Sequence, residues 1–144
     1  MKVNCLNFAS SNDSRYLLLY GSELIIKQDI ADQILQSLKA QGFNDKVSLH
    51  QDELDQAEEI IMRNVGGSLF QEKLILHLKH TSGKFPEKIK LILENQHLYN
   101  SDNLALIVES SIEKTPASGN WIKNMDEKGL IVSCGKLKTV EEKL

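Results

Sequence analysis

Short apolar runs alternate along this chain with longer stretches in which apolar residues recur every three or four positions. The first run covers residues 16–20 and is closed by Gly21. An apolar run of this length without a polar interruption is typical of a strand that is buried on both faces of a parallel sheet. By the same reasoning we predict further strands at residues 47–49, 73–79, 104–108 and 130–132.

The stretch after Gly21 has the spacing of an amphipathic helix, which Ser22 is expected to cap and Gly42 to end. Its apolar face is predicted to hold Ile26, Ile30, Ala31, Ile34, Leu35 and Leu38. Its solvent-exposed face is predicted to hold Lys27, Gln28, Asp32, Gln33, Gln36 and Lys39. Further helices are expected to open at Asp52, at Pro86 and at Thr115-Pro116, the last of them ending at Gly129.

Strands that alternate with helices of this length favour right-handed crossovers and a parallel sheet. We therefore expect an α/β fold with a five-stranded, mainly parallel sheet and helices on both faces. A chain of 144 residues is long enough to bury a core without a disulfide or a structural metal. Residues 1–135 are expected to form one domain, and the charged residues 136–144 are expected to begin a linker.

The composition argues against several classes of partner. With a net charge of −3, the chain offers no concentrated basic face for nucleic acid or an anionic membrane. Cys5 and Cys134 stand in no CxxC pair, so we interpret them as small buried thiols of a reducing compartment. No signal peptide and no apolar run of membrane-spanning length is evident, which predicts a cytoplasmic protein.

The turn after the first strand is the place where nucleotide-binding sheets hold phosphate. A phosphate loop there needs several glycines and a lysine followed by Ser or Thr. This chain has Tyr20-Gly21-Ser22-Glu23, with one glycine and a carboxylate that would repel phosphate. We therefore expect no ATP hydrolysis and no bound cofactor at this turn.

Other catalytic patterns are also weak. His77 and His80 lie three positions apart on a predicted strand, where they point to opposite faces, so they predict a solvated or structural role and no metal site. His50 and His97 each stand alone, and Trp121 has the spacing of a core residue. No Gly-x-Ser-x-Gly elbow is present. The sequence predicts no intrinsic catalysis.

The segment Gly66-Gly67-Ser68-Leu69-Phe70 places two large apolar side chains on a connection between a helix and a strand. A double glycine normally ends a helix, and polar turn residues usually follow it. Ser68 and Gln71 can form a capping box that holds the turn rigid. Leu69 and Phe70 would then project as an anchor for a partner's pocket; in the plainer interpretation they begin the next strand or cap the core.

Taken in order, several segments together resemble a known family. The ordered set is Tyr16-Leu17-Leu18-Leu19-Tyr20-Gly21, Gly42-Phe43, Ser68-Leu69-Phe70, Leu104-Ala105-Leu106-Ile107-Val108, Trp121 and Leu130-Ile131-Val132-Ser133-Cys134. From about residue 16 onward, the chain resembles the N-terminal domain of the delta subunit of bacterial DNA polymerase III. The resemblance implies a RecA-like, AAA+-related (P-loop NTPase-like) fold without a working phosphate loop.

The resemblance also implies a function in protein binding. The delta subunit belongs to the clamp loader of the DNA polymerase III holoenzyme, a DNA-directed DNA polymerase, and inserts a hydrophobic plug into a pocket on the ring-shaped sliding clamp (the beta subunit). The plug's Leu-Phe pair falls on Leu69 and Phe70, preceded by Ser68. Relatives can carry a methionine where this chain has Gly67, which would make the plug smaller.

Beyond this domain, the family has a lid domain and a collar domain that joins the other loader subunits, and DNA is met only indirectly. This chain is expected to stop where the lid would start. Two alternatives stay open: a small nucleotide-binding α/β enzyme that uses the Gly21 turn, and a receiver-like interaction domain. The receiver normally gathers acidic residues at its strand ends, whereas the first strand here ends in Tyr20-Gly21.

Overall fold

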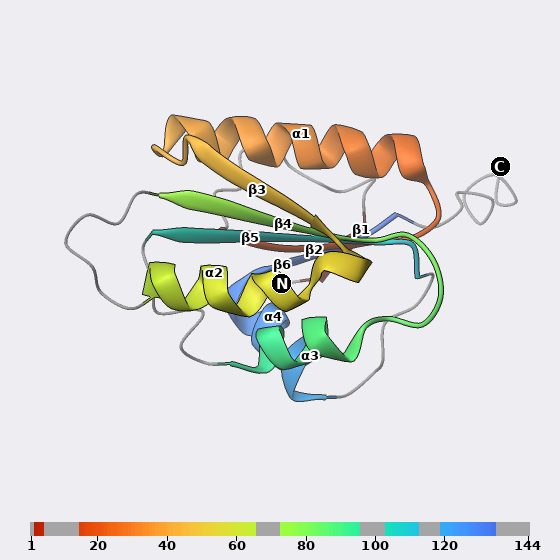
Figure 1. Ribbon diagram of the computed structural model, residues 1–144. Helices are drawn as coiled ribbons and strands as arrows, with labels where there is room; N and C mark the ends of the chain where they lie inside the picture. The colour runs from red at the N-terminus through yellow and green to blue at the C-terminus, as the bar shows by residue number, and fades with distance from the viewer. Residues whose placement is uncertain (1, 5–14, 66–72, 96–102, 113–118, 135–144) are drawn as a thin grey trace, which may run out of the picture.

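The structure is a computed structural model that describes residues 2–4, 15–65, 73–95, 103–112 and 119–134. In chain order its elements are β1 (Lys2–Asn4), β2 (Tyr16–Tyr20), α1 (Leu24–Ala40), β3 (Asp45–His50), the short 3-10 helix η2 (Gln51–Glu53), α2 (Asp55–Val65), β4 (Leu74–His80), α3 (Glu87–Glu94), β5 (Leu104–Ser110), α4 (Asn120–Lys128) and β6 (Leu130–Ser133). Strands and helices thus alternate as the hydrophobic pattern predicts (Figure 1).

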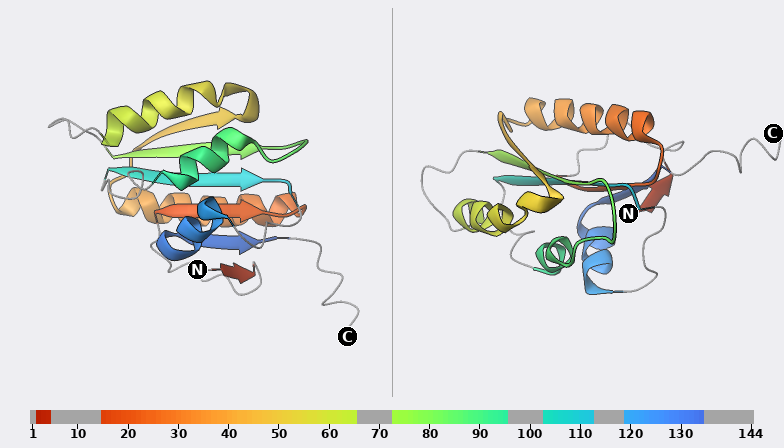
Figure 2. Two further views of the ribbon diagram at one scale, coloured as in Figure 1. Left: turned by 90° about the horizontal axis from the view of Figure 1, so that it is seen from below. Right: turned by 45° about the vertical axis from the view of Figure 1, so that its right-hand side comes forward.

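All described strands belong to one sheet with the order β1-β6-β2-β5-β4-β3, and every neighbouring pair is parallel. The five predicted strands are therefore confirmed. The sheet has a sixth strand that the sequence analysis missed, β1, which pairs with β6 at one edge through the register Val3↔Val132. β3 forms the opposite edge (Figure 2).

The strand order distinguishes this fold from that of a receiver-like domain. Without β1, and numbered from β2 as the first strand, the order is 5-1-4-3-2. A receiver-like domain has the order 2-1-3-4-5. The receiver alternative is therefore wrong, because its third strand would lie beside the first, whereas here β5 and β6 flank β2.

The helices divide unequally between the two faces of the sheet. Of the described helices, α1 covers one face, whereas α2, α3 and α4 cover the other (Figures 1 and 2). This division follows from right-handed crossovers, because the chain moves across the sheet in one direction after β2 and in the other direction after every later strand. Leu17, Leu19 and Ile107 pack under α1, while Leu18, Leu76 and Leu106 pack against the three-helix layer.

Two helix starts differ from the prediction. The N-cap of α1 is Glu23, without a side-chain capping hydrogen bond, so the predicted cap at Ser22 is wrong. The helix expected from Asp52 begins with η2, and α2 itself starts at Asp55. Gly42 ends α1 as expected, with a φ of 99° that favours glycine. The start predicted at Thr115-Pro116 lies outside the described residues.

Candidate functional site

The predicted anchor lies on the connection between α2 and β4. α2 ends at Val65 and β4 begins at Leu74, so both flanking elements are present where the sequence predicts them. Gly67, Ser68, Leu69 and Phe70 fall in residues 66–72, outside the described part of the chain. The capping box and the outward direction of the two apolar side chains therefore stay predictions.

The strand that follows the predicted anchor is firmly held. β4 pairs with β3 on one side and with β5 on the other, and the Leu74 amide donates to Asn103 O at 2.8 Å. Lys73 Nζ donates to Gln41 O at 2.8 Å and lies 5.3 Å from the centre of the Phe43 ring. A connection whose ends are held by the sheet has less conformational entropy to lose when a partner binds it.

The helix that precedes the predicted anchor is also fixed to the sheet. Ala57, Ile60 and Ile61 are buried against the core of the three-helix layer. Glu58 and Glu59 on the outer side are exposed, as a solvated helix face predicts. The connection from α2 to β4 thus follows a helix that packs on the core and precedes a strand that is paired on both sides.

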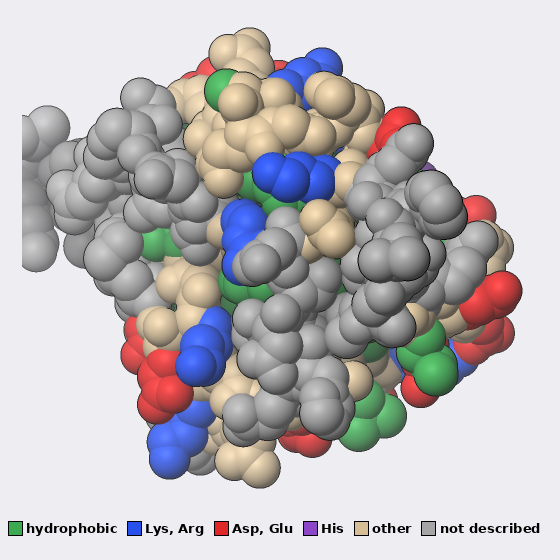
Figure 3. Space-filling model, turned by 90° about the vertical axis from the view of Figure 1, so that its left-hand side faces the viewer, with side chains coloured by type: hydrophobic (Ala, Val, Ile, Leu, Met, Phe, Trp, Pro, Cys, Tyr) green, Lys and Arg blue, Asp and Glu red, His purple; other side chains and the backbone are tan. Residues whose placement is uncertain are grey.

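Basic side chains mark the end of the molecule at which this connection lies. The amino ends of the parallel strands and the carboxyl ends of the helices meet here, and Figure 3 shows Lys and Arg side chains crossing this end. Lys39 and Lys128 stand in the last turns of α1 and α4, where a cation interacts favourably with the helix dipole. Asp and Glu side chains lie at the margins of the same end, so both charge signs are present there (Figure 3).

The opposite edge of the sheet is the place where a nucleotide would bind in a related fold. Only residues 21–23 connect β2 to α1 there. The Glu23 amide donates to Cys134 O at 3.0 Å, and the Cys134 amide donates to Tyr20 O at 2.6 Å. A backbone amide that would face phosphate in a phosphate loop is thus already bonded within the protein.

Lys27 is buried, which contradicts its predicted place on the solvent-exposed face of α1. Its side chain is 4% exposed, and Nζ donates to Ser110 O at 2.9 Å. Burial lowers the pKa of Lys27, and the nearby Glu109 carboxylate opposes that shift. The ammonium therefore belongs to a bond inside the protein and does not extend toward a phosphate.

Glu109 is the acidic residue whose charge interacts with that of Lys27. Its Oε1 lies 3.1 Å from His77 Nε2, and the two side chains are 13% and 4% exposed. The hydrogen bond with His77 lowers the pKa of Glu109, assisted by the charges of Lys79 and Lys27 and opposed by burial. The sequence analysis did not identify this polar cluster, which is defined here as Lys27, His77 and Glu109.

His80 is buried on the other face of the sheet, as the alternation of side chains along β4 requires. Its Nδ1 lies 2.9 Å from Ser110 Oγ, and its ring meets Phe85 edge-on. Phe85 stacks in turn on Trp121, which is buried as predicted. Both histidines therefore have structural positions, whereas His50 is exposed and His97 lies outside the described residues.

We expect the Glu109→Gln substitution to lower the free energy of unfolding by about 1–3 kcal/mol, because a charged hydrogen-bond acceptor becomes a neutral one. The folded pKa of Glu109 lies below its ordinary value of 4.5, so its stabilisation is present above 4.5 and is lost as the pH falls through the folded pKa. The difference between the two proteins should shrink on acidification in urea titrations. A constant difference across that range, or an equal effect of Glu94→Gln at an exposed position, would contradict this assignment.

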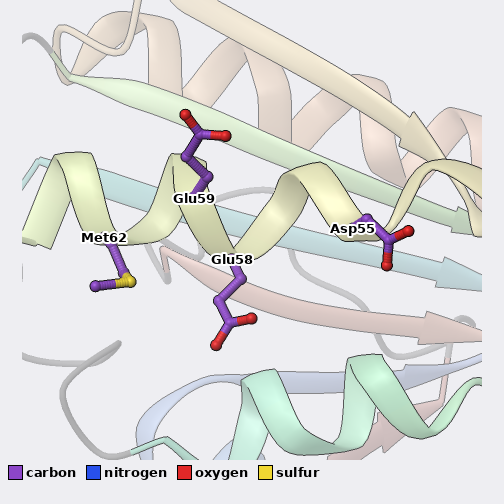
Figure 4. Close-up of a pocket in the computed structure, with 4 residues that line it drawn as sticks. All are labelled: Asp55, Glu58, Glu59 and Met62. Atoms are coloured by element: carbon purple, nitrogen blue, oxygen red, sulfur yellow. The ribbon is translucent and has the colours of Figure 1, made fainter.

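A shallow hollow on α2 is lined by Asp55, Glu58, Glu59 and Met62 (Figure 4). The carboxylates of Glu58 and Glu59 point to different sides of the helix, and Asp55 pairs with Lys88 of α3. Within the described residues, no group of three or more His, Cys, Asp or Glu side chains is arranged to hold a metal ion. This hollow is therefore a solvated face of α2.

A family model described as DNA polymerase III, delta subunit matches residues 16–135. The chain belongs to this family. The match contains the buried β2 run, the 66–72 connection and the carboxyl end of the sheet. No curated protein matches the sequence significantly.

Two solved structures resemble this delta-family domain. The DNA clamp loader delta protein of Bacillus subtilis superimposes with a TM-score of 0.57 and 18% identity, over 88% of this chain and 40% of that chain. The DnaC helicase loader superimposes with a TM-score of 0.50 and 15% identity, over 90% of this chain and 84% of that one. These similarities show an AAA+-like fold, as the sequence analysis expected. The delta-family domain thus spans less than half of the B. subtilis protein.

Among the described residues, none of the helices combines the length and apolar character required to cross a bilayer.

Proposed function

We propose that this delta-family domain is a non-catalytic part of a clamp loader that binds the ring-shaped sliding clamp through Leu69 and Phe70. The observation that carries the proposal is the family match over residues 16–135, which includes the Ser68-Leu69-Phe70 segment. The segment connects two firmly packed elements at one end of the sheet. Insertion of the two side chains into the clamp would favour an open ring during loading onto DNA.

The chemistry of the segment fits a small, concentrated contact. Burial of each apolar side chain contributes about 1.5–3 kcal/mol, and a few such residues commonly dominate an interface. Gly67 adds no side chain, so the anchor depends on Leu69 and Phe70 with Ser68 shaping the turn. A pull-down of a purified sliding clamp by this protein tests the proposal directly; failure of the clamp to be retained at micromolar concentrations would refute it.

We expect no binding of ATP with Mg²⁺. The nucleotide edge holds internal hydrogen bonds from Glu23 and Cys134, and the Lys27 ammonium is directed to Ser110 O. Isothermal titration with ATP and Mg²⁺ should therefore give no heat beyond dilution. A saturable isotherm would instead favour the rival function, a nucleotide-binding enzyme that uses the Gly21 turn.

The wider assembly is part of the same proposal. Other clamp-loader subunits would be joined through domains beyond the one described, with residues 136–144 as the start of the connection. Contact with DNA would be indirect, and the protein would work in the cytoplasm as part of the DNA polymerase III holoenzyme. Proteolysis followed by mass spectrometry can test the domain boundary, because cleavage should concentrate after residue 135.

A further inference from the structure

β3 forms a free edge of the sheet. It pairs with β4 on one side, and no described element continues the sheet beyond it on the other (Figure 2). The unpaired side of an edge strand presents backbone N–H and C=O groups that can bond to a further strand. β3 contains neither proline nor glycine, so nothing in its sequence interrupts this row of groups.

The register of the sheet identifies the backbone groups that point outward. The Leu74 amide donates to Asn103 O beside β5, so Leu74 bonds toward β5. Successive residues of a strand bond to opposite sides, and the next residue, Ile75, therefore bonds toward β3. Ile75 lies opposite Lys46, and in a parallel pair it bonds to the residues on either side of that partner. The N–H and C=O groups of Lys46, and by the same alternation those of Ser48, therefore point away from the sheet.

These outward groups have no partner within the described part of the domain. Lys46 and Ser48 are exposed, and no hydrogen bond joins their outward N–H and C=O groups to another described residue. At the end of the strand, the His50 N–H already donates to Glu53 Oε1 at 3.1 Å. An added strand would therefore bond to Lys46 and Ser48 and would end where η2 begins.

The two faces of β3 determine which side chains an added strand would carry. Lys46 shares the face of its partner Ile75, which packs under α1, and Lys79 follows on the same face of β4. The Lys46 ammonium forms no ion pair with a described carboxylate. Val47 lies on the other face, half-buried against the three-helix layer, together with Asp45. An acidic side chain on the α1 face and an aliphatic one beside Val47 would complement this edge.

The charge of Lys46 also selects between possible occupants. A lysine on an edge strand commonly prevents like strands from pairing. A second copy of β3 would bring a second Lys46 to the same edge, whereas an acidic strand would form an attractive cross-strand pair with it. The edge therefore suits a partner strand of opposite charge better than a second copy of this chain.

We propose that β3 is a docking edge for an extended segment of a partner protein in which acidic and aliphatic residues alternate. The segment bonds to the backbone of Lys46 and Ser48 as an added strand, a common mode of peptide recognition. Its acidic side chains lie beside Lys46, and its aliphatic side chains lie beside Val47. The contact is separate from the predicted anchor and gives this delta-family domain a second surface for a partner.

NMR titration of the whole 144-residue protein with a capped heptapeptide of alternating glutamate and valine tests the proposal. We expect saturable shifts of the amide resonances of residues 45–50, with the largest at Lys46 and Ser48, whose N–H groups gain acceptors. A peptide with lysine in place of glutamate should bind about tenfold more weakly, because an attractive cross-strand charge pair becomes a repulsive one.

Two variants separate the backbone contact from the charge contact. Ser48→Pro removes an outward N–H and keeps the bonds to β4, since proline is tolerated on an edge strand where the N–H faces solvent; it should abolish peptide binding. Lys46→Glu should weaken binding of the glutamate peptide about tenfold and strengthen binding of the lysine peptide. The matched control Lys84→Glu makes the same charge change at an exposed position outside the sheet and should change neither.

Absence of saturable shifts at millimolar glutamate peptide would overturn the proposal, as would binding that survives Ser48→Pro. If Ser48→Pro lowers Tm, Lys46→Glu decides, because it changes only an exposed side chain. Shifts of residues 45–50 that depend on protein concentration alone would make a second copy the occupant and would also overturn it. The Leu69→Ala, Phe70→Ala protein should bind the peptide as the wild type does, so this proposal and the clamp proposal fail separately.

Discussion

Replacing Leu69 and Phe70 together by alanine is expected to abolish measurable binding to the sliding clamp while the domain stays folded. If both side chains are buried in a pocket of the clamp, their loss should cost more than about 2 kcal/mol, which is about a thirtyfold rise in Kd. Each single variant should lie between the wild type and the double variant. Surface plasmon resonance with immobilised clamp gives the affinities, and thermal melting gives the folded state.

The matched control is Leu91→Ala, because Leu91 is an apolar side chain that is 63% exposed on α3 and outside the predicted anchor. It removes a comparable exposed side chain from the same helical layer, so it should leave the affinity unchanged. Undiminished binding of the Leu69→Ala, Phe70→Ala protein would refute the assignment of the anchor. A fall in Tm of that protein by more than a few degrees would support the plainer interpretation, in which the pair belongs to the core.

The fold was predictable because its signals are local. A continuous apolar run such as residues 16–20 has few structural options, and it is a central strand with neighbours on both sides. β1 was missed because Lys2–Asn4 is short and contains no apolar run. Its place depends on pairing with β6, which lies more than a hundred residues away in sequence, and no local pattern records such a partner.

Lys27 shows where reasoning from residue type alone fails. Because lysine is charged, the sequence analysis placed it on the solvent-exposed face, although it stands three and four positions before Ile30 and Ala31 on the apolar stripe. The spacing was the better guide, since Lys27 is buried with the rest of that stripe. Its acceptor, Ser110 O, comes from β5, so the interaction that makes the burial tolerable could not be read locally.

For the candidate site, the sequence allowed predictions about individual segments of the chain but not about the surface of a partner. From Gly21 and Glu23 alone, the sequence analysis predicted that the first turn is no working phosphate loop, and the hydrogen bonds of the Glu23 and Cys134 amides agree with that prediction. The anchor at Leu69 and Phe70 depends on a partner's pocket. A sequence can indicate that two apolar residues interrupt a polar connection, but the complementary surface belongs to another molecule.

Replacing Gly129 by alanine is expected to destabilise the domain more than the same replacement at Gly42, Gly83 or Gly119. A Cβ at this position would lie 2.5 Å from Tyr16 O and 2.8 Å from Tyr16 Cβ. Tyr16 begins β2, which is paired with β5 and β6, so its backbone cannot move aside without disturbing the centre of the sheet. The cost should reach the upper end of the roughly 1–3 kcal/mol that overpacking produces, lowering Tm by roughly 6–12 °C.

Gly83→Ala is the control that separates crowding from backbone strain. Gly83 has a φ of 79° and nothing within 4 Å of an added Cβ, so alanine there meets only the conformational cost of about 1–2 kcal/mol for a left-handed residue. Gly129 has a φ of −139°, which any residue adopts, and the sequence analysis assigned it simply as the end of a helix. If the close approach to Tyr16 is what requires glycine, calorimetric melting must rank Gly129→Ala below Gly83→Ala in stability. The reverse order would mean that the contact between the end of α4 and β2 relaxes, and that Gly129 is needed only to end the helix.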